Sequence, residues 1–167
     1  MVLNVRDIEE AHHFWVDLLG FTQVGEWKGG DGRPDFTMRF YASAGHHHDL
    51  ALMESENVAE PDEPWSMVGS GCAVNHIAIT YPDRDSWKRQ VDFLVSEGVT
   101  VNRRIDHGMT HSVYVNDPNG YGVEVLYDLP REVWEHDIDG ALNYAKNLPT
   151  DGPGLTDETE YTSDFWN

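Results

Sequence analysis

The chain has 167 residues, 40% of them hydrophobic and 11% aromatic, which is enough for one core or two small packed modules. Its formal net charge of −19 would repel nucleic acid and anionic membrane surfaces, so small molecules are the expected partners. The sequence shows neither a long apolar run nor a secretory signal, so we predict a cytoplasmic protein without a transmembrane helix. Its single cysteine, Cys72, cannot form an intrachain disulfide and is expected to be a small core residue.

The first half of the chain predicts a strand, a helix and three further strands. "MVLNVRD" (1–7) is an apolar strand that ends at Asp7, a residue suited to begin a helix. Apolar residues then recur at helical spacing as far as Gly20, where a positive φ is expected to end the helix. The strand-like stretches that follow are "FTQVGEW", "DFTMRFYAS" and "HDLALME".

The second half repeats this order after a polar connector, "SENVAEPDEPWSMVGSG" (55–71). "NHIAITYPD" (75–83) predicts a strand, a helix runs from about Arg84 to Gly98, and a strand begins at Val99. "THSVYVN" and "YGVEVLYD" predict a hairpin joined by the turn "NDPNG". Each half is therefore β-α-β-β-β.

A repeat of this kind predicts an α+β protein with two paired βαβββ modules, because each module leaves one sheet face in need of a partner. We expect modules 1–56 and 71–128 to form one domain, 1–128, as an open curved mixed sheet around a metal cavity. The remainder, 129–167, is an acidic C-terminal extension with a helical candidate, "DIDGALNYAKNL" (137–148).

Glu124 is the unusual residue of the last predicted strand, because it lies among apolar neighbours. By the two-residue period, it faces the cavity if Val123 and Val125 pack on the helix; the alternative is a solvated surface acid. His76 begins another apolar strand, where a histidine can also be a satisfied core or surface residue. Imidazole and carboxylate on facing strands are, however, donors that a divalent metal requires.

The repeat extends this pair to a set of matching corners. Aligning Leu3 with Ile79 carries Glu124 back to His48 and His76 back to the position immediately before Met1. The expected corners are therefore His48, His76, Glu124 and a residue that is absent from the chain as given.

Several motifs together resemble the vicinal oxygen chelate superfamily (glyoxalase, bleomycin resistance and dioxygenase proteins), over roughly residues 1–128. In order along the chain they are "HDLAL", "NHIAI", "DHG", "HSVY" and "DPNGYGVEV". The ordered set is most similar to type I extradiol ring-cleavage dioxygenases. That resemblance implies cleavage of a catechol-type ring, a small aromatic diol as substrate, dioxygen as co-substrate and a homo-oligomer.

The resemblance also implies a metal site and assigns its residues. Fe(II) is the expected ion, with Mn(II), Zn(II) or Ni(II) as alternatives, and the ligands would be His76, Glu124 and a histidine at the position before Met1. His48 resembles an acid/base that assists deprotonation of the substrate, and Tyr114 a hydroxyl that hydrogen-bonds it. His107 and His111 resemble substrate-binding histidines.

Two other functions remain open at this point. A glyoxalase-like metal-dependent isomerase or epimerase would use a carboxylate from the first half, for which Glu54 is the candidate. A metal-free small-molecule binding protein of the resistance type would need no complete ligand set.

Overall fold

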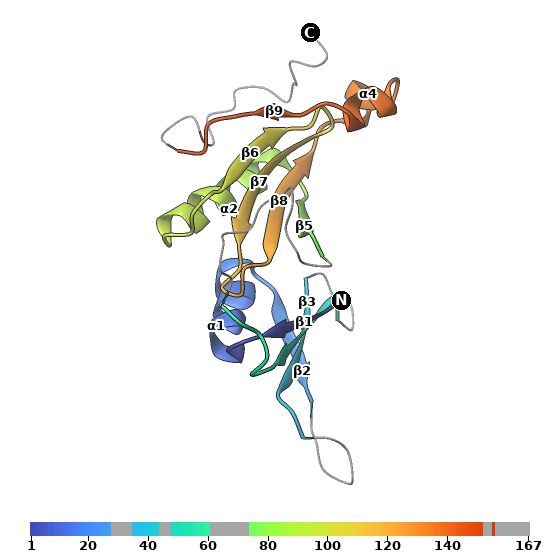
Figure 1. Ribbon diagram of the computed structural model, residues 1–167. Helices are drawn as coiled ribbons and strands as arrows, with labels where there is room; N and C mark the ends of the chain where they lie inside the picture. Colours follow the sequence, from blue (N-terminus) through green and yellow to red (C-terminus); the bar gives the residue numbers. More distant parts are fainter. Residues whose placement is uncertain (28–34, 44–47, 61–73, 152–154, 156–167) are drawn as a thin grey trace. The chain divides into compact units, whose positions relative to one another are not determined.

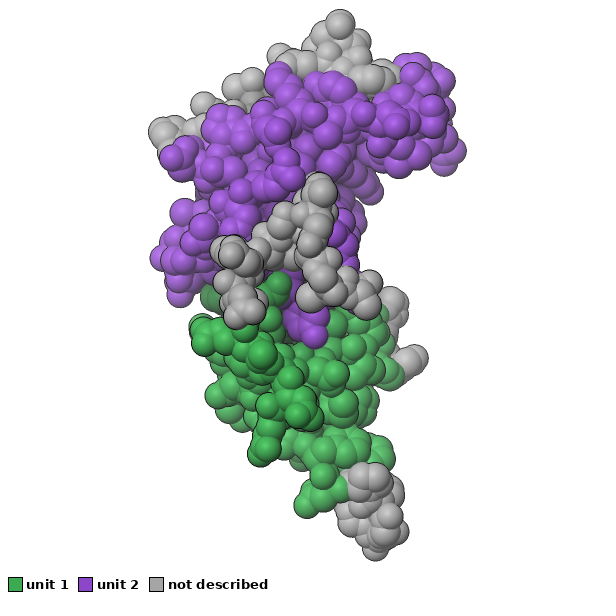
Figure 2. Space-filling view, viewed as in Figure 1, with its two compact units in different colours: residues 1–64, 117–120 green, residues 65–116, 121–167 purple. Residues whose placement is uncertain are grey.

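The computed structural model describes residues 1–27, 35–43, 48–60, 74–151 and 155; Cys72 lies outside these ranges. It divides into two compact units (Figure 2), one formed by residues 1–64 with 117–120 and the other by residues 65–116 with 121–167. Each unit contains one mixed sheet with helices, so the predicted α+β class is confirmed. Within the described residues, no helix has the length and apolar character that a membrane crossing requires.

The first unit contains a four-stranded sheet in the order β1-β4-β3-β2 (Figure 1). Its strands are β1 (Val2–Val5), β2 (Thr22–Glu26), β3 (Met38–Ala42) and β4 (Leu50–Glu54), and β1 runs parallel to β4. A β-bulge interrupts the pairing of β2 with β3 between Gln23 and Gly25.

One helical segment covers this sheet and begins as the sequence predicts. The side chain of Asp7 accepts hydrogen bonds from the backbone N–H groups of Glu9 and Glu10 at the start of α1 (Ile8–His12). The segment then continues as a π-helix, η1 (His13–Leu18), a widening that the apolar spacing does not reveal. Gly20 follows with a φ of 79°, as expected for the residue after a helix.

The second unit contains a five-stranded sheet in the order β5-β8-β7-β6-β9 (Figure 1). Its main strands are β5 (His76–Tyr81), β6 (Arg103–Asp106), β7 (Thr110–Asn116) and β8 (Gly122–Asp128), with β5 parallel to β8. The strand predicted from Val99 starts later, because the Val99 N–H still bonds to the Leu94 carbonyl at the helix end.

Helix α2 (Arg84–Ser96) packs on one face of this sheet. Its first turn is capped by Asp83, which accepts from the Ser86 N–H at 2.7 Å. Trp87 is fully buried, and its indole N–H donates to the Val125 carbonyl at 2.9 Å. The ring of Trp87 also lies 5.1 Å from that of Tyr127, so Tyr127 and its alternate neighbour Val125 lie on the helix-covered face of β8 and Glu124 lies on the opposite face.

The residues after β8 pack on the second unit. Short helices α3 (Arg131–Trp134) and α4 (Ile138–Leu142) lead to β9 (Lys146–Asn147), which pairs antiparallel with β6. The helix expected over 137–148 is therefore confined to its first part, because the later residues extend the sheet. Leu148 continues this edge by donating its N–H to the Arg104 carbonyl at 2.9 Å.

Candidate functional site

His76 and Glu124 lie side by side on neighbouring strands of the second unit. β5 and β8 pair so that His76 is opposite Gly122 and Ala78 is opposite Glu124, which puts both polar side chains on one face. Nε2 of His76 is 3.2 Å from Oε2 of Glu124. The structure thus brings the two predicted ligands together on the face that α2 does not cover.

Asn75 defines which nitrogen of His76 faces Glu124. Nδ1 of His76 is 2.7 Å from Oδ1 of Asn75, and because an amide oxygen only accepts, Nδ1 carries the hydrogen. A neutral imidazole then presents the lone pair of Nε2 to an anionic carboxylate, which is favourable only when a cation lies between them. A proton or a metal ion satisfies this condition, and a partner on the second nitrogen is the usual support of a metal-binding histidine.

Tyr114 joins the pair from β7, where it lies opposite Glu124. Its hydroxyl is buried and donates to Oε1 of Glu124 at 2.7 Å, so the carboxylate has a separate partner on each oxygen. Burial, reinforced by the hydrogen bond to Glu124, raises the pKa of Tyr114 far above that of an ordinary tyrosine. Tyr114 is therefore a neutral donor in the folded protein.

His107 completes this group from the turn between β6 and β7. Its Nε2 is 3.0 Å from the hydroxyl oxygen of Tyr114. The single hydrogen of that hydroxyl is directed to Glu124, so Nε2 of His107 is the donor in this contact. We call His76, His107, Tyr114 and Glu124 the site cluster; its members form one continuous chain of polar contacts.

His111 does not belong to the site cluster. It pairs with Tyr127, the two rings stack at 5.5 Å, and Tyr127 in turn contacts Trp87 of α2. The side chain of His111 is thus buried on the helix-covered face, opposite to Glu124. The expected substrate-binding role of His111 therefore has no support in its placement.

His48 lies in the first unit, is exposed, and packs its ring edge-on against Phe40 at 5.3 Å. Phe40 pairs with Ala51, whereas its neighbour Tyr41 pairs with Leu50 on the helix side of the sheet. The ring of His48 accordingly lies on the face of the sheet that α1 leaves uncovered. Glu124 likewise lies on the uncovered face of its own sheet in the second unit.

The strand registers nevertheless correct the match of His48 to Glu124. When the Asp caps of the two helices are aligned, Val2 matches Ala78. Val2 pairs with Ala51, 49 positions further on, whereas Ala78 pairs with Glu124, 46 positions further on. Ala51 is therefore the counterpart of Glu124, and His48 precedes β4. The sequence alignment missed this difference of three residues because it assumed one constant offset.

Glu54 lies on the helix side of β4. Its Oε1 accepts a hydrogen bond of 3.0 Å from the Ile8 N–H at the start of α1, and it pairs with Val5, which is fully buried. Glu54 does not share a face with His48, because β4 begins only at Leu50 and strand alternation does not extend back to residue 48. The placement of Glu54 gives no support to the isomerase alternative.

His76 and Glu124 could serve as two ligands of one metal ion. Two ligand atoms at about 2.1 Å from an ion and at right angles to each other lie about 3 Å apart, close to the His76–Glu124 separation. No group of three His, Cys, Asp or Glu side chains with metal-binding geometry occurs among the described residues. The sequence analysis missed Asn75, although its place directly before His76 in "NHIAI" was a usable signal.

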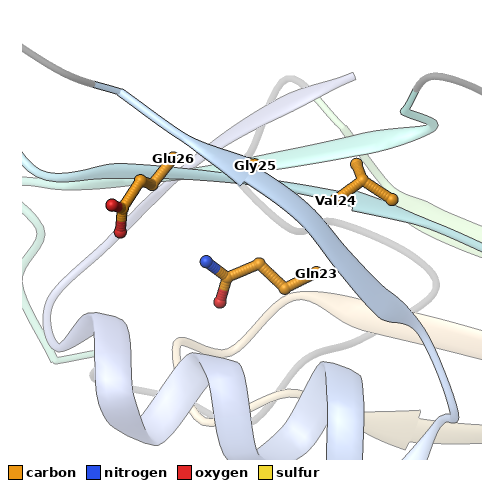
Figure 3. A pocket seen from close by; sticks show the side chains of 4 residues that line it. All are labelled: Gln23, Val24, Gly25 and Glu26. Atoms are coloured by element: carbon orange, nitrogen blue, oxygen red, sulfur yellow. The ribbon is translucent and has the colours of Figure 1, made fainter.

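A shallow hollow of about 400 Å³ lies along β2 of the first unit, lined by Gln23, Val24, Gly25 and Glu26 (Figure 3). All four residues come from one bulged edge strand, so the described part of the chain gives the hollow no opposing wall to bury a ring. None of the predicted site residues lines it, and we assign it no function.

Comparison with known proteins identifies the family. The model of the glyoxalase/bleomycin resistance protein/dioxygenase superfamily matches residues 1–125, three quarters of the chain. The chain belongs to this superfamily. The match covers both β-α-β-β-β halves and includes His76, Tyr114 and Glu124.

Two curated members of the superfamily are dioxygenases. Catechol-2,3-dioxygenase of Bacillus subtilis is 27% identical over 157 residues, which cover 93% of this chain and 50% of the relative. Biphenyl-2,3-diol 1,2-dioxygenase 2 of Rhodococcus globerulus is 30% identical over 82 residues, 49% of this chain and 40% of the relative. The chain thus spans about half the length, or less, of these relatives.

The fold of the superfamily recurs in solved structures. Glyoxalase I of Leishmania major superposes with a TM-score of 0.58 at 20% identity, over 83% of this chain and 89% of that one. At this identity the similarity establishes the shared fold and leaves the chemistry to the site residues.

Proposed function

We propose that this chain forms the metal-holding part of an extradiol dioxygenase that cleaves a catechol-type aromatic ring. The proposal rests on one observation above all: the imidazole of His76 and the carboxylate of Glu124 are 3.2 Å apart, with the far nitrogen of His76 anchored on Asn75. The two curated dioxygenases supply the substrate class, an aromatic ring with adjacent hydroxyls. Fe(II) is the proposed ion.

In this proposal His76 and Glu124 bind the ion, which would supply the place where the diol and dioxygen meet. Glu124 is mostly buried and receives a hydrogen bond from Tyr114, which holds it in position and limits its access to water. Asn75 accepts from Nδ1 of His76, so in the neutral imidazole Nε2 carries the lone pair and can act as a ligand.

Two members of the site cluster are proposed to act on the substrate. Tyr114, kept neutral by burial, would turn its single hydroxyl hydrogen from Glu124 to a phenolic oxygen of the bound diol, and His107 presents an N–H beside it. His48, which lies in the first unit, is proposed as an acid/base on the family resemblance alone, since imidazole suits proton transfer near neutral pH.

The direct test is anaerobic reconstitution of the purified chain with Fe(II), followed by catechol or 2,3-dihydroxybiphenyl and air. We expect oxygen consumption and a yellow ring-opened product. His76→Ala and Glu124→Ala should lose iron and product together, whereas His13→Ala, which removes an exposed histidine paired with Asp17, should not change either. Substrate binding that is equal with and without iron would instead support a metal-free binding protein.

A further inference from the structure

We infer that Asp106 is a positioning residue that holds the imidazole of His107 on the hydroxyl of Tyr114. The inference deepens the proposed function and rests on it for the catalytic value of that contact. Asp106 lies outside the site cluster, and its side chain is on the opposite face of the sheet, because it pairs with His111. It acts through the turn that follows it.

The turn from Asp106 to Thr110 is tied at two points. Oδ1 of Asp106 accepts a hydrogen bond of 2.7 Å from the N–H of Gly108, and the N–H of His107 donates to the Thr110 carbonyl at 2.9 Å. Gly108 has a φ of 78°, a left-handed conformation that a side chain would strain. His107 is therefore held between a carboxylate anchor on one side and a fixed glycine on the other.

Asp106 is itself held rigidly. It is 3% exposed, and a carboxylate so buried is tolerated only where polar partners receive it. Besides Gly108, its Oδ1 has Nε2 of His111 at 3.9 Å, and the ring of His111 stacks on the fully buried Tyr127. The anchor of the turn thus belongs to the packed, helix-covered side of the sheet.

The consequence appears on the other face. The β6–β7 pairing ends at the Asp106–His111 pair, so the position of His107 depends on the turn rather than on the strand ladder. Its Nε2 reaches the Tyr114 hydroxyl at 3.0 Å, and that hydroxyl reaches Glu124 at 2.7 Å. Loss of the Asp106 anchor should free His107 while leaving His76 and Glu124 in place.

The experiment compares two replacements of Asp106. Asp106→Asn keeps an oxygen that can accept from Gly108, whereas Asp106→Leu keeps the branch at Cγ and removes the acceptor. Asp83→Ala is the matched control, because it removes another carboxylate that anchors a backbone N–H in the same unit. Gly108→Ala disturbs the same turn without changing Asp106, and it serves if the Leu variant does not fold.

Three readouts are combined: the nuclear Overhauser contact between the rings of His107 and Tyr114, the exchange rate of the Gly108 amide, and Fe(II) affinity. For Asp106→Leu or Gly108→Ala we expect loss of the ring contact, faster exchange, and unchanged iron affinity. With catechol, kcat/KM should fall about 10–100-fold, mainly through kcat. Asp106→Asn and Asp83→Ala should retain the ring contact and most of the turnover.

The inference is overturned if the ring contact persists in Asp106→Leu, or if Asp106→Asn loses it as completely as Asp106→Leu does. A chain that binds iron but cleaves no catechol in any form would overturn the proposed function, while the ring contact would still report on the position of His107.

Discussion

The hydroxyl of Tyr114 donates to Oε1 of Glu124 at 2.7 Å, while Nε2 of His76 lies 3.2 Å from Oε2 of the same carboxylate. One carboxylate thus accepts a hydrogen bond from a neutral hydroxyl and also lies beside the imidazole of a candidate metal ligand. Because the two oxygens have separate partners, the contribution of Tyr114 can be removed without removing a ligand.

Tyr114→Phe should therefore separate turnover from metal binding. We expect Fe(II) to bind with nearly the same affinity, because both ligand side chains remain, and kcat for catechol to fall about 10–100-fold. Iron content and initial rates, measured side by side, check this prediction. Tyr144→Phe, which removes a hydroxyl in the C-terminal extension, is the control, and a Tyr114→Phe enzyme with full turnover would contradict the role of the hydroxyl.

Two fully buried indoles among the described residues predict losses of different size from the same change. Trp87 donates to the Val125 carbonyl, whereas the indole N–H of Trp15 has no acceptor among the described residues. Trp87→Phe leaves a buried carbonyl without its donor and should lower the free energy of unfolding by about 1–3 kcal/mol more than Trp15→Phe does. Urea denaturation of both variants measures the difference; equal losses would contradict the prediction.

Leu148 offers a test of the sheet edge. Its N–H donates to the Arg104 carbonyl, and Leu148→Pro removes that donor, whereas Leu148→Ala keeps it. Only the Pro variant should speed amide exchange in β6 and expose its edge to self-association. Hydrogen exchange and light scattering provide the measurement, and identical behaviour of the two variants would exclude a stabilising role for this pairing.

Alkaline pH should weaken the folded protein through Tyr81. Burial raises the pKa of Tyr81 to about 12, above the value of about 10 in an unfolded chain. Its contribution is complete below pH ~10 and is lost as pH rises through about 12, since only the unfolded chain ionises easily there. Relative to Tyr81→Phe, the wild-type protein should lose up to about 2 kcal/mol over this interval. Denaturant titrations at several pH values check it.

The sequence predicted the element order and the shared face of His76 and Glu124 because both depend on local rules. Asp caps, glycines after helices and two-residue alternation act within a few residues, and they correctly located both helix starts. The same rules could not reveal the π-helix of the first half, because Phe14, Trp15 and Leu18 fit an apolar face in either kind of helix.

Residues whose orientation depends on how strands pair were the difficult ones. His111 was expected beside the substrate because its motif resembles the family, but pairing with Tyr127 directs it to the helix side. His48 illustrates the same limit, since the register before β4 depends on contacts between strands. Such contacts leave no periodic signal in a single sequence.

The registers of the two parallel strand pairs, β1/β4 and β5/β8, differ, and this difference matters for any design that transfers the site residues of the second half to the first half. A residue of β8 that is moved to β4 by the spacing of the Asp caps is placed three positions before its structural counterpart. Because three is an odd number and side chains alternate along a strand, its side chain then points to the wrong face of the sheet. A carboxylate meant to reproduce Glu124 belongs at Ala51. Across β3 its partner is Phe40, as Tyr114 is the partner of Glu124, so the transplant consists of Ala51→Glu together with Phe40→Tyr. Design by strand partner would thus place an acid on β4 and a hydroxyl on β3 at the positions that correspond to Glu124 and Tyr114.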